Sequence, residues 1–109
     1  MAERSIRTFQ FLNMAVSAPG TAERITAYYV PESFTVILTN PVGSAGNFYI
    51  AETQAKAQSA AQPRKILVPG QSIAMKVSNT AAIWVDADSA SDELEVYVGD
   101  EVSGNTPSP

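Results

Sequence analysis

The sequence of 109 residues contains no cysteine and no histidine. Without cysteine, the chain has no disulfide, no thiolate zinc site and no cysteine nucleophile. Without histidine, it lacks the commonest general base and the commonest metal ligand of proteins. These absences exclude Ser-His-Asp catalysis and most zinc chemistry. The sequence therefore favours a protein that is not an enzyme, holds no cofactor or metal and takes no small-molecule substrate.

Charge is also scarce, because charged residues make up only 17% of the chain, against roughly 25% in typical soluble domains. The net charge is −4, and no basic residue follows Lys76, whereas acidic residues continue to Glu101. A protein that tracks nucleic-acid phosphates needs a basic stripe, so this distribution argues against nucleic acid as a partner. The apolar runs are far shorter than a bilayer span, so we expect no membrane association.

What the chain does contain is a series of short segments in which apolar and polar residues alternate. They cover residues 5–17, 23–30, 33–39, 48–53, 64–68, 73–78, 81–87 and 93–99, separated by turn formers such as Pro69-Gly70. About eight short strands at this spacing predict an all-β sandwich or barrel. We expect one β-sandwich domain of the jelly-roll or Greek-key type. Its parts would be an N-terminal arm with the first strand (1–12), the sandwich (13–101) and a polar C-terminal tail (102–109).

Two segments fit this pattern less well. In 5–17, Phe9, Phe11 and Met14 fall on one side only if the strand contains a bulge near Thr8 or Leu12. Residues 54–62 are rich in alanine and glutamine and have no apolar stripe that could anchor a helix to a core. We therefore predict a surface loop for 54–62, with a turn or two of helix as the alternative.

The acidic stretch after Ile83 is the one place where the sequence hints at chemistry. Alternation sets Trp84, Asp86 and Asp88 on one face of a strand, and Glu95 and Tyr97 on one face of the next. The intervening residues 88–92, DSASD, form a plausible hairpin loop. We expect a two-stranded ribbon whose outer face is acidic and solvated.

A metal site is the alternative for these acids. An EF-hand loop that began at Asp86 would need an oxygen ligand, a glycine and a glutamate where the chain has Ala90, Ser91 and Tyr97. A looser calcium site made of Asp86, Asp88 and Asp92 stays open. A glycosidase needs two carboxyl groups across a cleft, which neighbours on one ribbon do not supply.

Trp84, on the polar side of its strand, has three possible roles. It is covered by residues 54–62 or by the N-terminal arm, or it contacts another subunit, since aromatic side chains are common at interface hot spots. The third role is a sugar-stacking platform together with Tyr97 or Tyr28.

Two long stretches carry a resemblance to a known family: ITAYYVPESFTVILTNPVGSAGNFYIAET (25–53) and ILVPGQSIAMKVSNTAAIWVDADSASDELEVYVGDE (66–101). In the order of their strands, their Leu-x-Pro-Gly-x-Ser turn and their acidic last strands, they resemble small all-β virion proteins of tailed bacteriophages, of the capsid decoration or cement type. The resemblance implies a structural protein on the capsid surface, made in the host cytoplasm. It also implies the major capsid protein and copies of itself as partners, commonly as a homotrimer, and it supplies no catalytic residues.

For such a protein the candidate interface residues lie in the arm, the 54–62 segment, the aromatic positions and the tail. They are Arg4, Ile6, Arg7, Phe9, Tyr28, Gln54, Lys56, Trp84, Tyr97, Asp100 and Glu101. The competing hypotheses are another virion component, such as a tail, head-closure or fibre-base module, and a carbohydrate-binding β-sandwich for host adhesion.

Overall fold

The computed structural model describes residues 9–99, and within them every predicted strand segment overlaps one strand. The strands are β1 (Gln10–Met14), β2 (Glu23–Arg24), β3 (Thr35–Thr39), β4 (Phe48–Ala51), β5 (Lys65–Leu67), β6 (Ser72–Met75), β7 (Trp84–Ala87) and β8 (Leu94–Gly99). A single-turn helix, α1 (Gln54–Ala57), follows β4, and a short 3-10 helix, η2 (Thr80–Ala82), precedes β7. The prediction of an all-β chain with about eight strands is confirmed.

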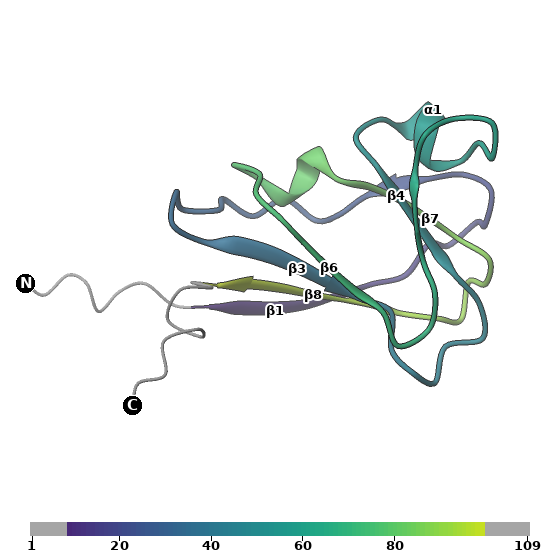
Figure 1. Ribbon diagram of the computed structural model, residues 1–109, viewed down its shortest axis with the longest axis horizontal. Helices are drawn as coiled ribbons and strands as arrows, with labels where there is room; N and C mark the ends of the chain where they lie inside the picture. The colour runs from purple at the N-terminus through teal and green to yellow at the C-terminus, as the bar shows by residue number, and fades with distance from the viewer. Residues whose placement is uncertain (1–8, 100–109) are drawn as a thin grey trace, which may run out of the picture.

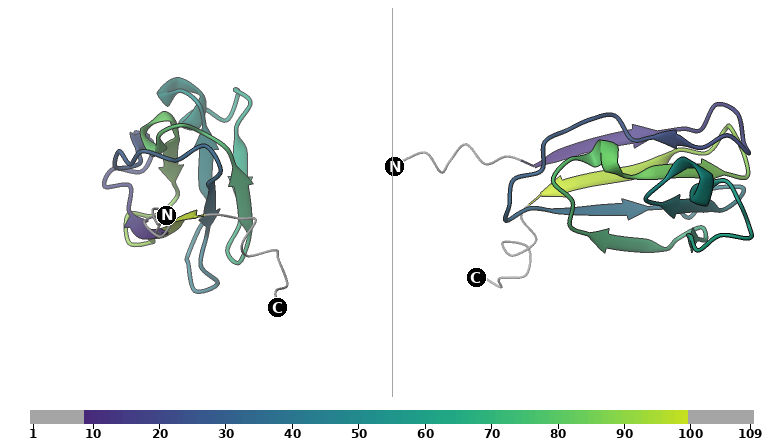
Figure 2. Two further views of the ribbon diagram at one scale, coloured as in Figure 1. Left: turned by 90° about the vertical axis from the view of Figure 1, so that its left-hand side faces the viewer. Right: turned by 90° about the horizontal axis from the view of Figure 1, so that it is seen from above.

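The strands form two antiparallel four-stranded sheets, in the orders β1-β8-β3-β6 and β2-β7-β4-β5 (Figure 1). The chain changes sheet at every connection except that between β4 and β5. In the right-hand view of Figure 2 the first sheet runs in order from purple β1 through yellow β8 and blue β3 to green β6. This interleaving is the topology of a jelly roll, so the fold prediction holds in its finer form as well.

The core lies between the two sheets, and the period of two along each strand selects its members. Its fully buried side chains include Val36, Leu38, Val96, Phe48, Leu67 and Val85. At the turn from β5 to β6, the N–H of Gln71 donates to the carbonyl of Val68 at 3.0 Å. Gly70 takes a φ of +89° there, which favours glycine and explains why this turn could be predicted.

The first strand contradicts one expectation about side-chain direction. Its pairing with β8 runs without a break from Gln10↔Val98 to Met14↔Leu94, so β1 has no bulge at Leu12, and Thr8 lies outside the described residues. Leu12 and Met14 pack against the core. Phe9 and Phe11 consequently point away from it, at 60% and 70% exposure. The domain boundary predicted after residue 12 falls inside this paired strand.

The predicted acidic ribbon is wrong, because β7 and β8 belong to different sheets. The chain between them crosses from one layer of the sandwich to the other. Two of the acids are buried, Asp86 at 4% exposure and Asp92 at 8%, whereas Glu93 and Glu95 are exposed. A buried carboxylate needs hydrogen-bond donors, so the partners of these aspartates explain the difference.

Asp92 binds the loop between β3 and β4. Its carboxylate accepts hydrogen bonds from the backbone N–H of Ala45 at 2.9 and 3.0 Å and from that of Gly46 at 2.9 Å. Hydrogen bonds to a charged acceptor are stronger than neutral ones. Asp92 therefore ties the crossover segment to a loop that lies 46 residues earlier in the chain.

Asp86, near the end of β7, and Asp88, on the crossover, make further contacts of this kind. Asp86 accepts from the N–H of Gly20 at 2.8 Å, and Asp88 accepts from the N–H of Asn47 at 2.9 Å and from the Tyr49 hydroxyl at 2.7 Å. Gly46 makes the close approach possible, since a Cβ there would lie 2.6 Å from the Cβ of Asp88. Asp88 and Asp92 thus both bind the loop between β3 and β4, whereas Asp86 binds the loop between β1 and β2.

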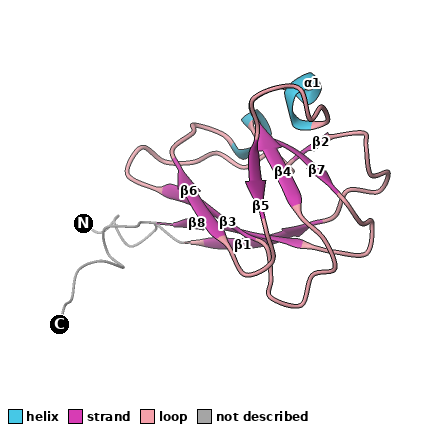
Figure 3. Cartoon of the chain, turned by 45° about the vertical axis from the view of Figure 1, so that its right-hand side comes forward, coloured by secondary structure: helices cyan, strands magenta, loops and turns pink. Residues whose placement is uncertain are grey.

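Residues 54–57 form the helix α1, where we had predicted a surface loop. Ala57 is fully buried, and the amide side chains of Gln54 and Gln58 bond the two backbone groups of Ala22 at 3.1 and 2.8 Å. The helix packs on β4 and β7, on the side of the second sheet that faces away from the first (Figure 3). The helix has no apolar stripe, which was the reason for predicting a loop. It is held instead by the hydrogen bonds of Gln54 and Gln58 to the backbone of Ala22.

We expect Asp92→Ala to lower the free energy of unfolding by about 1–3 kcal/mol, because two backbone N–H groups lose their acceptor. Urea denaturation followed by the fluorescence of Trp84, the single tryptophan, measures this change. The exposed neighbour Glu93 supplies the control: Glu93→Ala should stay within about 0.5 kcal/mol of the wild type. Equal effects of the two substitutions would show that the loop contact contributes nothing.

Candidate interaction surface

The outer face of the first sheet carries a cluster of three aromatic rings, Phe9, Phe11 and Tyr97, here called the aromatic ridge. The ring centroids of Phe11 and Tyr97 are 5.2 Å apart, those of Phe9 and Phe11 5.5 Å, and those of Phe9 and Tyr97 6.1 Å. The two phenylalanines remain mostly exposed. Contiguous apolar patches on a protein surface are common at sites of protein contact.

Local sequence explains how the ridge forms. Phe9 and Phe11 alternate with core residues of β1, and Phe11 pairs directly with Tyr97 of β8. Gly99 lies two residues beyond Tyr97 on the same face, where a Cβ would collide with the Tyr97 hydroxyl. The glycine thus leaves room for the Tyr97 ring to lie along its own strand.

On the other half of the same face, over β3 and β6, the side chains in this row are smaller. The register continues from Tyr97 to Ile37 of β3 and from Ile37 to Ala74 of β6, so one row crosses all four strands. We call the β3–β6 half of this face the step. A hollow of about 320 Å³ lies between ridge and step, lined by Phe11, Leu12, Asn13, Ile37, Thr39, Glu95 and Tyr97.

The polar residues of this face lie at its two ends. At one end, the register places Glu95 beside Thr39, whose hydroxyl lies 2.7 Å from that of Ser72. At the other end, Lys76 follows the last residue of β6 and its ammonium donates to the carbonyl of Phe34 at 3.3 Å. The middle of the face is therefore apolar and uncharged.

The outer face of the second sheet is covered by the chain itself. The Arg24 guanidinium lies 5.0 Å from the Trp84 ring, and that of Arg64 lies 3.8 Å from the Tyr49 ring. Arg64 also donates to the carbonyl of Ala57 at 2.9 Å, which links this face to α1. Trp84 is half-buried there. The group that lies over its ring is Arg24 of β2, and not a side chain of residues 54–62, which were predicted to cover it.

The predicted interface residues do not form one surface. Phe9 and Tyr97 lie on the first sheet, whereas Trp84 lies on the opposite face of the sandwich. A sugar platform that combines Trp84 with Tyr97 is therefore excluded by geometry. Arg4, Ile6, Arg7, Asp100 and Glu101 lie outside the described residues.

The remaining candidates are engaged near α1 or only partly exposed. Gln54 bonds Ala22, and Lys56 pairs with Glu52 at 2.6 Å. Tyr28 is 36% exposed. Phe11 and Ile37 were not among the predicted interface residues. For Phe11 the reason is the bulge considered in β1, which would have turned its side chain inward. An uninterrupted alternation through Leu12 and Met14 was the pattern that could have identified Phe11.

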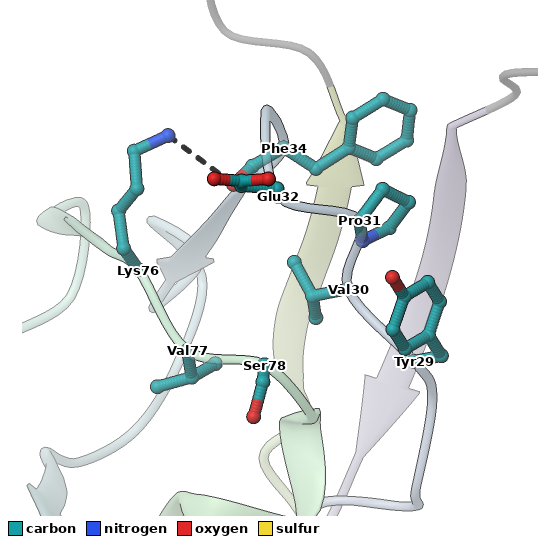
Figure 4. Close-up of a pocket in the computed structure, with 8 residues that line it drawn as sticks. All are labelled: Tyr29, Val30, Pro31, Glu32, Phe34, Lys76, Val77 and Ser78. Atoms are coloured by element: carbon teal, nitrogen blue, oxygen red, sulfur yellow. Dashed lines mark hydrogen bonds between the residues drawn. The ribbon is translucent and has the colours of Figure 1, made fainter.

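A second hollow, of about 350 Å³, lies at an end of the sandwich between residues 29–34 and 76–78 (Figure 4). Its polar side chains are Glu32, Lys76, Ser78 and the hydroxyl end of Tyr29. Figure 4 shows the Lys76 ammonium turned toward Glu32 and the Phe34 carbonyl to which it donates. Glu32 is the one carboxyl group among the residues that line this hollow. A glycosidase needs two carboxyl groups that face each other across a cleft, so this lining does not resemble a glycosidase site.

The described residues contain no group of three or more acidic, histidine or cysteine side chains placed to hold a metal ion. Asp86, Asp88 and Asp92 point to different backbone partners instead of converging on one point. Within residues 9–99, no helix is long and apolar enough to cross a membrane.

Comparison with known proteins adds no relative. No family model matches the chain, and no curated protein and no solved structure matches it either. A proposal about function therefore depends on the surfaces described above and on the resemblance of the sequence.

We expect Tyr49→Phe to reduce stability at neutral pH by no more than about 1 kcal/mol, since it removes one partly exposed hydrogen bond. Burial, and next the hydrogen bond to Asp88, raise the pKa of Tyr49 above its usual value of 10.0. A raised pKa means that the protonated phenol stabilises the fold. This contribution is complete below pH 10 and is lost as the pH rises through the raised pKa.

Chemical denaturation from pH 7 to 11 tests this dependence. The difference in stability between wild type and Tyr49→Phe should shrink in the alkaline range. Tyr29→Phe, at a position that is 73% exposed, is the matched control. A difference that stays constant with pH, or one that Tyr29→Phe reproduces, would contradict the assignment.

Proposed function

We propose that this protein is a capsid decoration, or cement, protein of a tailed bacteriophage, which binds the assembled head and stabilises it by bridging capsid subunits. The observation that carries the proposal is the exposed aromatic ridge on the surface of a small jelly roll with few charged residues. Such a surface suits a protein that works by contact. The resemblance of the sequence supplies the phage and the capsid.

The mechanism we propose is stabilisation by mass action. A protein that binds the assembled shell but not the separated subunits favours assembly by RT ln(1 + [L]/Kd) for each site. Such a protein needs no reaction and no cofactor, but it needs several contact surfaces on one small domain.

The two chain ends are the surfaces that we assign to the capsid. Gln10 pairs with Val98, so β1 begins where β8 ends, at one end of the sandwich. The segments that hold Arg4, Ile6 and Arg7, and Asp100 and Glu101, are attached at this same end. Arg4 and Arg7 before β1 and Asp100 and Glu101 after β8 give a bridge two kinds of charged contact with the major capsid protein. The protein would act on the capsid surface after synthesis in the host cytoplasm.

We expect the purified protein to co-elute with empty phage heads at hundreds of copies for each particle. Size-exclusion chromatography with light scattering, run with and without heads, measures both binding and copy number. Tens of copies or fewer would indicate a connector or tail module instead. A protein that does not bind heads at all would overturn the proposal.

Deletion of residues 1–8 should weaken head binding without unfolding the domain, because β1 begins at Gln10. Arg4→Glu combined with Arg7→Glu tests the same segment by charge alone. Circular dichroism and thermal unfolding confirm that the sandwich is intact. Unchanged binding by both variants would show that the arm is not a capsid contact.

A further inference from the structure

The outer face of the first sheet is thick on one side and thin on the other. The aromatic ridge occupies β1 and β8, and the step on β3 and β6 presents Ile37 and Ala74 in the same row. The hollow of about 320 Å³ lies where the two halves meet. Two such faces are complementary in shape if the aromatic ridge of each copy packs against the step of the other copy.

We propose that two copies of this chain pair face to face through this sheet, about a two-fold axis that runs along the strands between β8 and β3. This rotation exchanges β1 with β6 and β8 with β3 and keeps each row in place. Phe11 of one copy then faces Ala74 of the other, and Tyr97 faces Ile37. Every large side chain of the row meets a smaller one.

The alternative two-fold axis in the plane of the face runs across the strands, and it does not give this fit. It would set Phe11 against Phe11 and Ala74 against Ala74. The ridges would collide while the steps stayed apart, which leaves cavities that cost free energy. The unequal halves of the face thus select one axis.

The charges of the face agree with the same axis. Glu95 comes to lie over Thr39 of the other copy, so the two Glu95 carboxylates stay apart. Lys76, one residue beyond β6, and Phe9, one residue before β1, lie at the same end of the face and come together. A lysine over an aromatic ring is a favourable contact. No like charges of the described face meet.

The size of the face predicts a weak pair. Four strands at about 4.8 Å spacing and about five residues at 3.3 Å each give roughly 300 Å² of flat area. A stable interface buries about 800 Å² on each partner. We therefore expect dissociation constants of about 100 μM or weaker in solution, and effective pairing where copies are crowded. The pairing does not depend on the virion proposal.

Substitutions that change the packing of the ridge against the step distinguish specific pairing from nonspecific hydrophobic association. Ala74→Phe adds apolar surface but fills the step, so it should weaken association at least tenfold. Phe11→Ala should also weaken it. An equimolar mixture of the two variants should recover association. In the mixed pair, the one remaining Phe11 meets the native Ala74 of the other chain, and the phenylalanine introduced at position 74 meets the alanine introduced at position 11. Sedimentation velocity over a concentration series, up to about 1 mM, measures all of these.

Ala61→Phe is the matched control, since it adds the same ring at an exposed position away from this face. It should leave association unchanged. Stronger association of Ala74→Phe, or a mixture that behaves as the two variants do alone, would overturn the proposal. A wild-type protein that stays monomeric at 1 mM, or forms a trimer that ignores these substitutions, would overturn it as well.

Disulfide trapping tests the axis directly, because the chain has no native cysteine. Phe11→Cys combined with Ala74→Cys should form a covalent dimer under mild oxidation at high concentration, and each single variant should not. Efficient cross-linking of Phe11→Cys alone would show ridge against ridge and contradict the proposed axis. Phage heads enter neither experiment, so the virion proposal can fail without affecting this result.

Discussion

The jelly roll depends on how the crossover from β7 to β8 is held in place. Along this segment the chain leaves one sheet and enters the centre of the other. Asp88 and Asp92 on the segment bind the loop between β3 and β4, and Asp86, near the end of β7, binds the loop between β1 and β2. Their partners are mainly backbone N–H groups, which a short loop exposes and a carboxylate satisfies well. The acids that looked like a site for chemistry are thus structural, and the negative charge of the chain overstates the charge of its surface.

The two outer faces of the sandwich have opposite characters. On the second sheet, the helix α1 and two arginine–aromatic contacts cover the strands, and Trp84 is half-buried among them. On the first sheet, Phe9 and Phe11 stay exposed beside Tyr97. A chain that packs one face with its own residues and leaves aromatic rings on the other concentrates its contact area on one side. This asymmetry, more than any single residue, supports a role in assembly.

Strand positions were predictable because alternation and turn chemistry are local, as the Pro69-Gly70 turn and the β-branched run of β3 illustrate. Strand partners were not predictable from the same patterns. The residues DSASD at 88–92 are as suitable for a hairpin as for a crossover, and only the pairing of β8 with β1 and β3 decides between them. For the same reason the burial of Asp86 and Asp92 was missed. In the ridge, Phe9 and Tyr97 were among the residues predicted for an interface, but that they share one face follows only from the register of β1 with β8.

The position of β8 has a consequence for synthesis. This strand, the last of the described residues, lies between β1 and β3 in the middle of its sheet. Until β8 leaves the ribosome, β1 has no neighbouring strand and β3 has only β6 beside it. The nascent chain therefore carries an incomplete sheet whose apolar inner face is exposed. Pairing between strands so distant in sequence is slow to form. The domain therefore reaches its fold only after β8 has been synthesised, and in the interval its open strand edges are targets for chaperones and for misassembly between copies.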